Sequence, residues 1–422
     1  MHLLIELTAL KKNFLYSCIT ILEIFSCIKM KTERFLLLFI LMAVVVISGC
    51  KKANNSIYYD RNYVQEIKQT REAFSVFMAI NSVPGAQIAI YKEGKLIYSE
   101  GLGNSSIELK SDVTRETKFR LGNSTGILTS MAYHKLVENG TLHPDSSIYY
   151  YLPDFPRKGH NITIENLIQN TSGFREASLR EVTDPEYSYS IQQGIELFKD
   201  SDLVFTPGDY QTTSVFDYNL LGAIMEKQTG NNFDKIIREF VTDTLQLKNT
   251  ILDNPYAIIE GRSTFYDVNM YSFTLNAQTI DLRSNAPSLG YLSTSEDLAK
   301  FGNAILHSSY VSNGIREKLF KPVTLNMGFP ADMTNGWKLL KDRWERNFYG
   351  SIGNVTGGYS SLLISPDDDL VIAIMMNTTF LGSNFPDYQI ATFFIKKTED
   401  QIEYEKYQNE RKQQSDTVSE QF

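Results

Sequence analysis

The stretch FRLGNSTGILTS at residues 119–130 places small hydroxyl and amide side chains directly after a glycine and before an apolar run. Asn123, Ser124 and Thr125 therefore stand where an expected helix begins. A serine at a helix N-terminus is a typical nucleophile of acyl transfer, because the positive end of the helix dipole favours the negative charge that develops there. It must also have a neighbouring base that takes its proton. The question is whether this stretch supplies that base.

No base stands one helical turn after either candidate position. Gly126 lies three residues after Asn123, and Ile127 lies three residues after Ser124. His134 comes ten residues after Ser124, nearly three turns along the same helix, and is too far away to act. The alternative reading of residues 123–125 is structural, because Asn, Ser and Thr are preferred N-caps. The stretch frames a nucleophile site without containing a working one.

Charge and histidine content exclude several classes of function. The chain has 422 residues and a formal net charge of −8, which argues against nucleic acid or an anionic membrane surface as a partner. Four of its five histidines follow the N-terminal segment, at no metal-ligand spacing: His134, His143, His160 and His307. We expect neither a metal nor another cofactor.

The N-terminal segment reads as an export signal. From Met30, a basic start precedes an apolar run of 13 residues, Phe35–Ile47, which is short for a membrane span and suits a signal-peptide core. The ending ISGC resembles the lipobox of bacterial lipoproteins, which implies lipidation of Cys50. The alternatives are an ordinary secretory peptide or a short membrane anchor. We expect a signal region at 1–49, with Met30 as an alternative start, and a lipid-anchored protein of the bacterial cell envelope, on its periplasmic side or at the cell surface.

The elements that must position the site include two hairpins at opposite ends of the chain. Residues 86–101 alternate apolar and polar on both sides of Glu93-Gly94, and residues 359–378 form two β-rich runs about Pro366-Asp367-Asp368. We expect both ends to pair in one antiparallel sheet, flanked by helices.

Helical patterns fill the middle of the chain. Apolar residues recur at helical spacing over 127–140 and 216–230, each ending at a glycine, and 294–306 opens with an N-cap signature. The predicted fold is α+β, with a domain at 76–396 that contains a mainly helical subdomain at about 125–270. A spacer is predicted at 50–75 and a polar C-terminal tail at 397–422.

Several segments in order resemble the serine β-lactamase-related family, which includes class C β-lactamases, D-alanyl-D-alanine carboxypeptidases and related esterases. The resemblance covers about 300 residues and implies the β-lactamase/transpeptidase-like fold. The segments are VPGAQIAIYKEGKLIYSEGLG (83–103), TKFRLGNS (117–124), LVENGTLHPDSSIYYYLPDF (136–155), LIQNTSGF (167–174), TPGDY (206–210), YNLLGAIMEKQTG (218–230), GYLSTSEDLAKFGNAIL (290–306) and GGYSSLLISPDDDLVIAIMMNTT (357–379).

The family's chemistry uses a serine with a lysine three residues later, a tyrosine loop, and a third strand that carries a cation and helps to form the oxyanion site. Each element is degenerate here. Asn123 and Gly126 stand at the serine and lysine positions. Thr213 and Val215 flank Ser214 where the tyrosine loop is expected, and Ser351 stands at the third-strand cation. Because the members of such a site act together, their joint loss predicts an inactive centre in a retained cleft.

The resemblance places a binding cleft around these positions. In LIQNTSGF, Asn170 stands where the family usually has histidine, and Gly353 keeps the third-strand glycine. Tyr210 and Tyr218 flank the degenerate tyrosine loop, and either could enter the cleft in place of its tyrosine. The expected cleft residues are Asn123, Ser124, Asn170, Tyr210, Thr213, Ser351 and Gly353.

Three functions are compatible with these residues. The first is a catalytically silent, penicillin-binding-protein-like lipoprotein whose cleft binds a peptidoglycan-derived or other acyl-peptide ligand, or a protein partner. The second is a serine hydrolase of β-lactamase, D,D-peptidase or esterase type with a rewired nucleophile such as Ser124, or less favourably Ser214 or Ser351. The third is a scaffold that uses its outer surface and tail. We favour the first.

Overall fold

The computed structural model describes residues 56–407 apart from 184–185, 187–188, 270, 343, 383, 397–398, 400–401 and 405. The predicted signal region and Cys50 lie outside the described residues, as does most of the predicted tail. None of the helices in the described part of the chain is both long and apolar enough to cross a bilayer.

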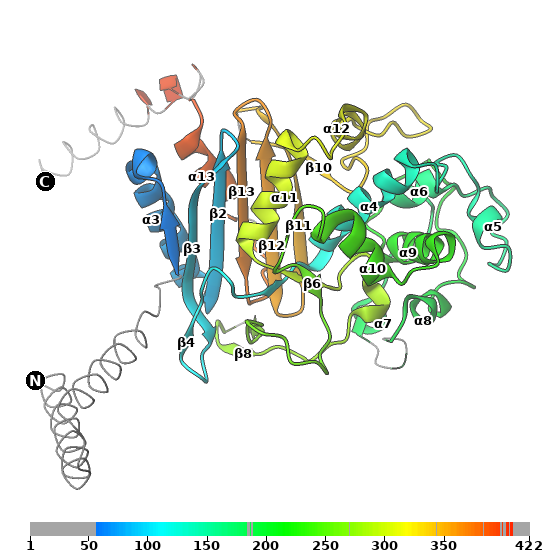
Figure 1. Cartoon of the computed structure of the whole chain (residues 1–422), viewed down its shortest axis with the longest axis horizontal. Helices are drawn as coiled ribbons and strands as arrows, with labels where there is room; N and C mark the ends of the chain where they lie inside the picture. Colours follow the sequence, from blue (N-terminus) through cyan, green and yellow to red (C-terminus); the bar gives the residue numbers. More distant parts are fainter. Residues whose placement is uncertain are drawn as a thin grey trace, which may run out of the picture. The chain divides into compact units, whose positions relative to one another are not determined.

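A large antiparallel sheet forms one side of the molecule (Figure 1). Its strands follow the order β1-β3-β2-β13-β12-β11-β10, with β4 paired to β3. Their bounds are β1 Ile57–Tyr59, β2 Gly85–Lys92, β3 Lys95–Ser106, β4 Ser111–Asp112, β10 Lys338–Lys341, β11 Asn347–Val355, β12 Gly358–Ser365 and β13 Leu370–Met376. Two small sheets lie beside it, one of β5 (Phe119–Arg120), β9 (Tyr291–Ser293) and β6 (Ile251–Leu252), the other of β7 (Tyr266–Val268) and β8 (Thr274–Asn276).

The predicted pairing of the two chain ends is confirmed by the register of β2 with β13, in which Ala89 faces Ala373. The first predicted hairpin is also present. It turns at Glu93 and Gly94, both with positive φ (52° and 74°), as a two-residue type I′ turn requires. The expected α+β architecture follows from these pairings and from the helices inserted between them.

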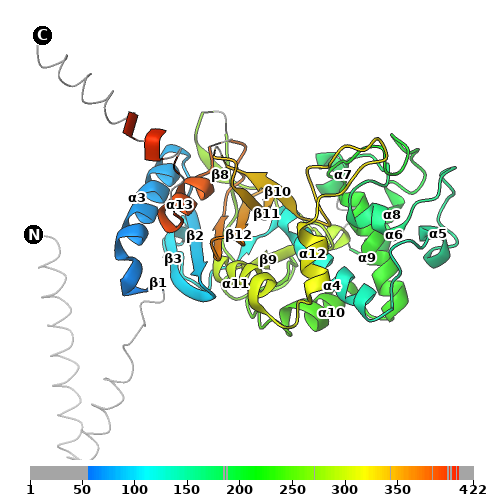
Figure 2. The ribbon, with the colours of Figure 1, turned by 90° about the horizontal axis from the view of Figure 1, so that it is seen from above.

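Alternating side chains divide the sheet into two apolar faces. In β13, Ile372 and Ile374 pack on one face, while Val371 and Ala373 join the core on the other. This is the two-residue period of a strand buried on both sides. α3 (Val64–Ile80) and α13 (Asp387–Phe394) cover the first face, and α11 (Ser295–His307) covers the second, as Figures 1 and 2 show.

The domain begins earlier than predicted. Much of the proposed spacer at 50–75 is structured, because β1 pairs with β3 and α3 buries Ile67, Phe74 and Phe77 against the sheet. These apolar residues lie on one face of the helix, and burying them stabilises it against the sheet. Residues 57–75 of the predicted spacer therefore belong to the folded domain.

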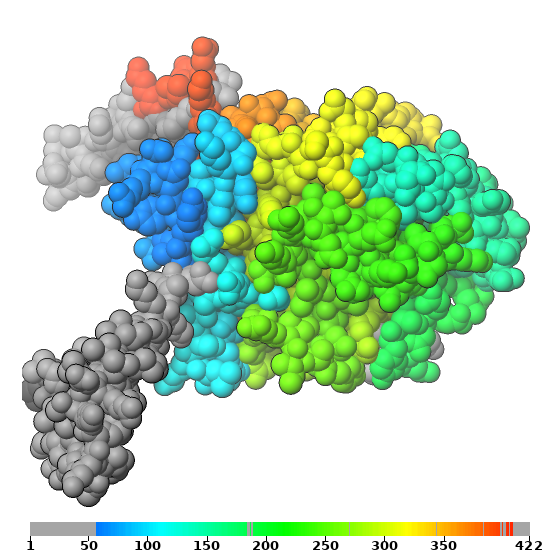
Figure 3. Space-filling view, viewed as in Figure 1, coloured from blue at the N-terminus to red at the C-terminus, as the bar shows by residue number. Residues whose placement is uncertain are grey.

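Helices from the middle of the chain form the other side of the molecule, drawn in cyan and green in Figure 3, with the first strands and α3 in blue at the opposite end. The predicted helices are present as α4, α9 and α11, and α9 ends at Gly230 in the left-handed conformation. Further bounds are α4 Gly126–Glu138, α5 Ile148–Tyr151, α6 Ile164–Ile168, α7 Leu179–Thr183, α8 Ile191–Glu196, α9 Val215–Thr229, α10 Phe233–Ile237 and α12 Asn313–Phe320.

Candidate functional site

A hollow of about 230 Å³ lies where α4, the N-terminal end of α9 and strand β11 meet. It contains most of the positions that sequence comparison assigned to the degenerate catalytic elements. The lining residues are Asn123, Gly126, Asn170, Thr213, Ser214, Val215, Tyr218, Ser288, Met333, Gly336, Lys338, Ser351, Ile352 and Asn354.

The segment before α4 is a 3₁₀ turn, Gly122–Thr125, and not a capped helix start. No side-chain hydrogen bond caps α4, so the N-cap interpretation of residues 123–125 is wrong. Thr125 Oγ1 instead accepts a bond from the backbone N–H of Tyr291 at 3.4 Å. Since residues 122–125 already coil, their side chains point away from the first amides of the helix.

Ser124 does not line the hollow. Its side chain is completely buried, and its Oγ has no hydrogen-bond partner among the described residues. A hydroxyl without a base or access to solvent is a poor nucleophile. The geometry therefore gives no support to Ser124 as a replacement nucleophile.

Asn123 occupies the serine position and faces β11. Its side-chain Oδ1 accepts a long hydrogen bond, 3.5 Å, from the backbone N–H of Asn354. The close approach of the two segments requires a glycine before Asn123, because a Cβ at Gly122, where φ is +55°, would lie 2.9 Å from the nitrogen of Asn354. A side-chain carbonyl thus covers the strand amide that would otherwise be available to the oxygen of an acyl ligand.

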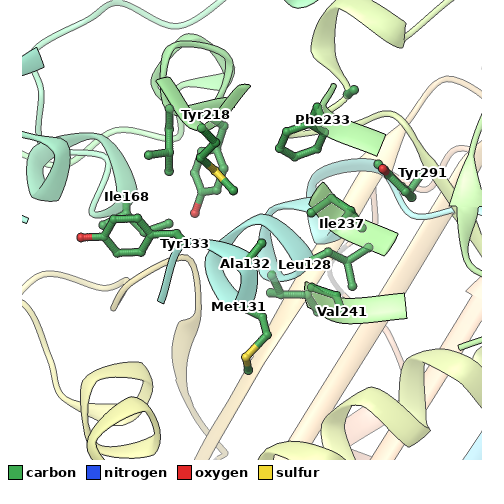
Figure 4. Packing of buried hydrophobic residues seen from close by; sticks show 14 of the residues in the cluster. Leu128, Met131, Ala132, Tyr133, Ile168, Tyr218, Phe233, Ile237, Val241 and Tyr291 are labelled. Atoms are coloured by element: carbon green, nitrogen blue, oxygen red, sulfur yellow. The ribbon is translucent and has the colours of Figure 1, made fainter. Parts of the chain in front are cut away.

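The lysine position is filled by an aromatic ring. A Cβ added at Gly126 would lie 3.2 Å from Cε1 of Tyr218, and a Cβ added at Gly336 would lie 2.6 Å from the Tyr218 hydroxyl. Figure 4 shows the Tyr218 hydroxyl pointing from α9 toward α4. The ring of Tyr218 therefore lies against Gly126 and takes up part of the space in which a lysine side chain would begin.

Tyr218 is suited to be a proton donor and not a base. Burial raises its pKa, and the neighbouring Asp217 raises it further. The phenol consequently stays protonated at neutral pH. Tyr218 therefore does not supply the base that the family's serine requires, and the one amine among the described lining residues, Lys338, comes from β10 and not from α4.

A buried polar network supports one wall. Asn170 Nδ2 donates to Asp217 Oδ2 at 3.2 Å and to the carbonyl of Ser214 at 3.1 Å, and Ser172 Oγ donates to the other Asp217 oxygen. Burial raises the pKa of Asp217, while the bonds from Ser172 and Asn170 lower it in part. Asn170 adopts a positive φ of 55°, which asparagine tolerates better than most residues.

The two residues of the third-strand motif in β11, Ser351 and Gly353, have different positions relative to the hollow. Ser351 lines the hollow, whereas Gly353 is packed beneath the turn before α4. A Cβ at Gly353 would lie 1.8 Å from the carbonyl oxygen of Leu121, so the retained glycine is required by the close approach of the two segments. Lys338, opposite Gly350 in the neighbouring strand, supplies the one cationic residue among the described lining residues.

The structure brings together four of the expected cleft residues, Asn123, Asn170, Thr213 and Ser351. Tyr210 lies elsewhere, 58% exposed, with its ring against Phe205. The lining residues outside the predicted cleft set are Gly126, Ser214, Val215, Tyr218, Ser288, Met333, Gly336, Lys338, Ile352 and Asn354. The sequence did point to Tyr218, because it flanks the degenerate tyrosine loop and could enter the cleft from there. The segment around Met333 carried no such signal, because it has no regular periodicity.

The described lining lacks the carboxylate and imidazole groups that bind metal ions and that most often act in acid–base catalysis. Aspartate, glutamate and histidine are absent from it, and no group of three or more His, Cys, Asp or Glu in the described part of the chain could hold a metal ion. What the hollow offers is hydroxyls, amides, one phenol and one ammonium group.

Comparison with known proteins agrees with this geometry at the level of the family. The family model described as Beta-lactamase matches residues 70–392. The chain belongs to the β-lactamase family. Among curated members, it is 23% identical over 447 residues to human "Serine beta-lactamase-like protein LACTB, mitochondrial", covering 81% of this chain and 82% of the relative. It is 23% identical over 301 residues to "Protein flp" of Staphylococcus aureus strain MW2, covering 70% and 60%.

Solved structures of the β-lactamase-like fold superpose on most of the chain. The octameric penicillin-binding protein homologue from Pyrococcus abyssi matches with a TM-score of 0.66 at 21% identity, covering 78% of this chain and 76% of that one. A D-stereospecific amidohydrolase from Streptomyces sp. matches with a TM-score of 0.65 at 20% identity, covering 78% and 98%. At these identities the likeness establishes the fold, and the chemistry depends on the residues of the site.

Proposed function

We propose that this protein is a catalytically silent member of the β-lactamase family, anchored to the bacterial envelope by a lipid on Cys50, whose cleft binds an acyl-peptide ligand such as a peptidoglycan fragment. The observation that carries the proposal is the Tyr218 ring at the lysine position. It fills the place of the base beside a position that already lacks the serine hydroxyl.

The lining supports an anionic ligand. The side-chain ammonium group of Lys338 has no hydrogen bond or ion pair with the described residues, and no acidic residue is among the described residues that line the hollow. In a chain with a net charge of −8, an unpaired lysine on a concave wall favours a carboxylate, which peptides carry at their C-terminus. The hydroxyls and amides of Thr213, Ser351 and Asn354 add bonds for a peptide backbone.

The first experiment tests for chemistry. The full-length protein in detergent is treated with a fluorophosphonate and with a labelled penicillin, and its intact mass is measured. We expect no adduct with either probe. A stoichiometric adduct would favour the rewired hydrolase, and mapping it to Ser351 or another hydroxyl would name the nucleophile.

The second experiment tests for binding. We expect an acetylated peptide ending in D-alanyl-D-alanine to raise the melting temperature in a saturable manner, and its C-terminal amide to raise it less. Lys338→Met should weaken binding of the free acid about tenfold, the loss of one charge-assisted hydrogen bond. Lys341→Met is the matched control, since Lys341 lies on the same strand, pairs with Glu345 and is absent from the lining. Equal binding by all three proteins would exclude Lys338 from ligand recognition.

A further inference from the structure

A second hollow, of about 660 Å³, lies away from the cleft, beside strands β5, β7 and β8. It shares no lining residue with the first hollow. Its wall includes two arginines, a buried aspartate and several hydroxyl and amide side chains. The residues that matter below are Arg120, Asp253, Arg262, Ser263 and Phe265.

Arg120 is held rigidly but incompletely bonded. The residue is 3% exposed, its Nη1 donates to the carbonyl of Thr356 at 2.7 Å, and its guanidinium lies over the ring of Phe265. Its Nε is buried and has no hydrogen-bond partner among the described residues; the nearest carboxylate oxygen, of Asp253, is 3.5 Å away. At that distance and orientation the two groups attract as ions without forming a hydrogen bond.

Ser263 supplies a second unsatisfied group on the same wall. The residue is 4% exposed, and its Oγ has no hydrogen-bond partner among the described residues. Buried polar groups in folded proteins are nearly always bonded, so an unpaired donor at the edge of a hollow points to a partner from outside the chain. The two residues that carry these buried atoms, Arg120 and Ser263, come from segments more than 130 residues apart in sequence and both line this hollow.

The local charge indicates what that partner is. Arg120 and Arg262 share the single carboxylate of Asp253, whose Oδ1 lies 3.2 Å from Arg262 Nη1, which leaves one positive charge in excess among the three. The other lining carboxylate, Glu108, accepts the hydroxyl of Tyr266 at 2.5 Å. Over the whole lining, the two arginines are balanced by Asp253 and Glu108, so the excess positive charge is local to Arg120, Arg262 and Asp253. Guanidinium groups there match the oxygens of carboxylate and phosphate.

We infer that this hollow is a second binding site, for a small oxyanion group, carboxylate or phosphate, held between Arg120, Arg262 and Ser263. The site is independent of the acyl-peptide cleft. The proposed site catalyses no reaction. It requires only an anionic group that accepts hydrogen bonds from the two unpaired donors and balances the local positive charge.

The test is thermal melting of the full-length protein in detergent with sodium phosphate or sodium acetate, against sodium chloride at equal ionic strength. We expect one or both oxyanions, but not chloride, to raise the melting temperature in a saturable manner. The stronger of the two identifies the ligand class. No rise with either oxyanion would overturn the inference.

Variants locate the effect. Ser263→Ala should melt like the wild type without oxyanion, because its hydroxyl has no bond to lose, yet need about tenfold more oxyanion for half of the shift. Arg262→Gln should lose most of the shift. Arg283→Gln is the matched control, since Arg283 also pairs with a buried aspartate, Asp281, at similar exposure but outside the hollow. Lys338→Met alters only the first hollow, so its melting temperature should still rise with oxyanion as that of the wild type does. A shift that persists in Ser263→Ala and Arg262→Gln, or disappears in Lys338→Met, would contradict this site.

Discussion

At the scale of single residues, one packing contact involves the position at which the family pattern has its lysine. Gly126 and Gly336 lie against Tyr218, and each leaves room for part of its ring. The glycine at the lysine position is therefore part of a rebuilt wall. Because the tyrosine comes from α9 and the glycine from α4, the exchange is visible only in three dimensions.

Replacing Gly126 by lysine should destabilise the fold by about 1–3 kcal/mol, the usual cost of overpacking a core. In the Tyr218→Ala background the same replacement should cost at least 1 kcal/mol less, because the ring it meets is gone. Urea denaturation of the four proteins of this double-mutant cycle measures the coupling. Additive effects would mean that Tyr218 does not occupy the lysine position. The variant Asn123→Ser, Gly126→Lys should form no penicillin adduct while Tyr218 is present.

His134 predicts a pH dependence of stability. Burial on α4, with a smaller contribution from the positive charge of Lys318, lowers its pKa to about 3. The folded protein therefore keeps this histidine neutral, whereas the unfolded chain binds a proton below about pH 6.5. Its contribution to stability is fully present above pH 6.5 and is lost as the pH falls toward 3, at about 1.4 kcal/mol per pH unit.

The check is the free energy of unfolding at pH 7 and pH 5. The wild type should lose about 2 kcal/mol more than His134→Leu over this interval. His160→Gln, at an exposed position, should lose as much as the wild type. If His134→Leu and the wild type have the same pH dependence, the histidine is not held neutral in the folded state.

At the scale of elements, the helix ends are set by local backbone chemistry. α9 ends at Gly230, whose φ of 68° is left-handed and which has nothing within 4 Å of an added Cβ. α12 contains Gly314 within its helical span, where an added Cβ would make only an ordinary contact. The same substitution should therefore have opposite effects at the two positions.

Gly230→Ala should destabilise the protein by about 1 kcal/mol, because alanine resists the left-handed conformation. Gly314→Ala should stabilise it by about 0.5–1 kcal/mol, because alanine loses less backbone entropy in a helix. Melting temperatures of the two variants measured beside the wild type give the signs. Two changes of the same sign would show that contacts outside the helices control these positions.

At the scale of the whole molecule, the proposed lipid anchor lies close in sequence to the start of the folded domain. Residues from Ser56 onward belong to the folded unit, and Ile57 begins β1. If Cys50 carries the lipid, the six peptide bonds between Cys50 and Ser56 reach at most about 20 Å even when extended. The sheet edge at β1 is then held close to the membrane surface.

Cys50→Ala should release the protein from carbonate-washed membranes, whereas Cys27→Ser should not, because Cys27 lies in the predicted signal region. Immunoblotting of the membrane and soluble fractions measures the distribution. Intact mass of the wild type should show a lipid on a chain that begins at Cys50. Retention of Cys50→Ala in the membranes would contradict the lipoprotein proposal.

The sequence by itself determined the sheet, the main helices and the degenerate catalytic elements. Period-two alternation around Glu93-Gly94 and helical spacing ending at Gly230 are local signals, so they could be read without tertiary contacts. The absence of the serine and the lysine from positions 123 and 126 is likewise a property of residue types alone. The extent of the domain was underestimated because the apolar positions of α3 are separated by charged residues.

Only the tertiary structure decided what replaced the lost groups. Ser124 turned inward, Tyr218 filled the lysine position, and Lys338 joined the wall from a strand next to the third motif. The second hollow likewise brings Arg120 beside Ser263. Each case depends on packing between segments far apart in the chain, and periodicity along the sequence carries no record of which distant side chain fills a given space.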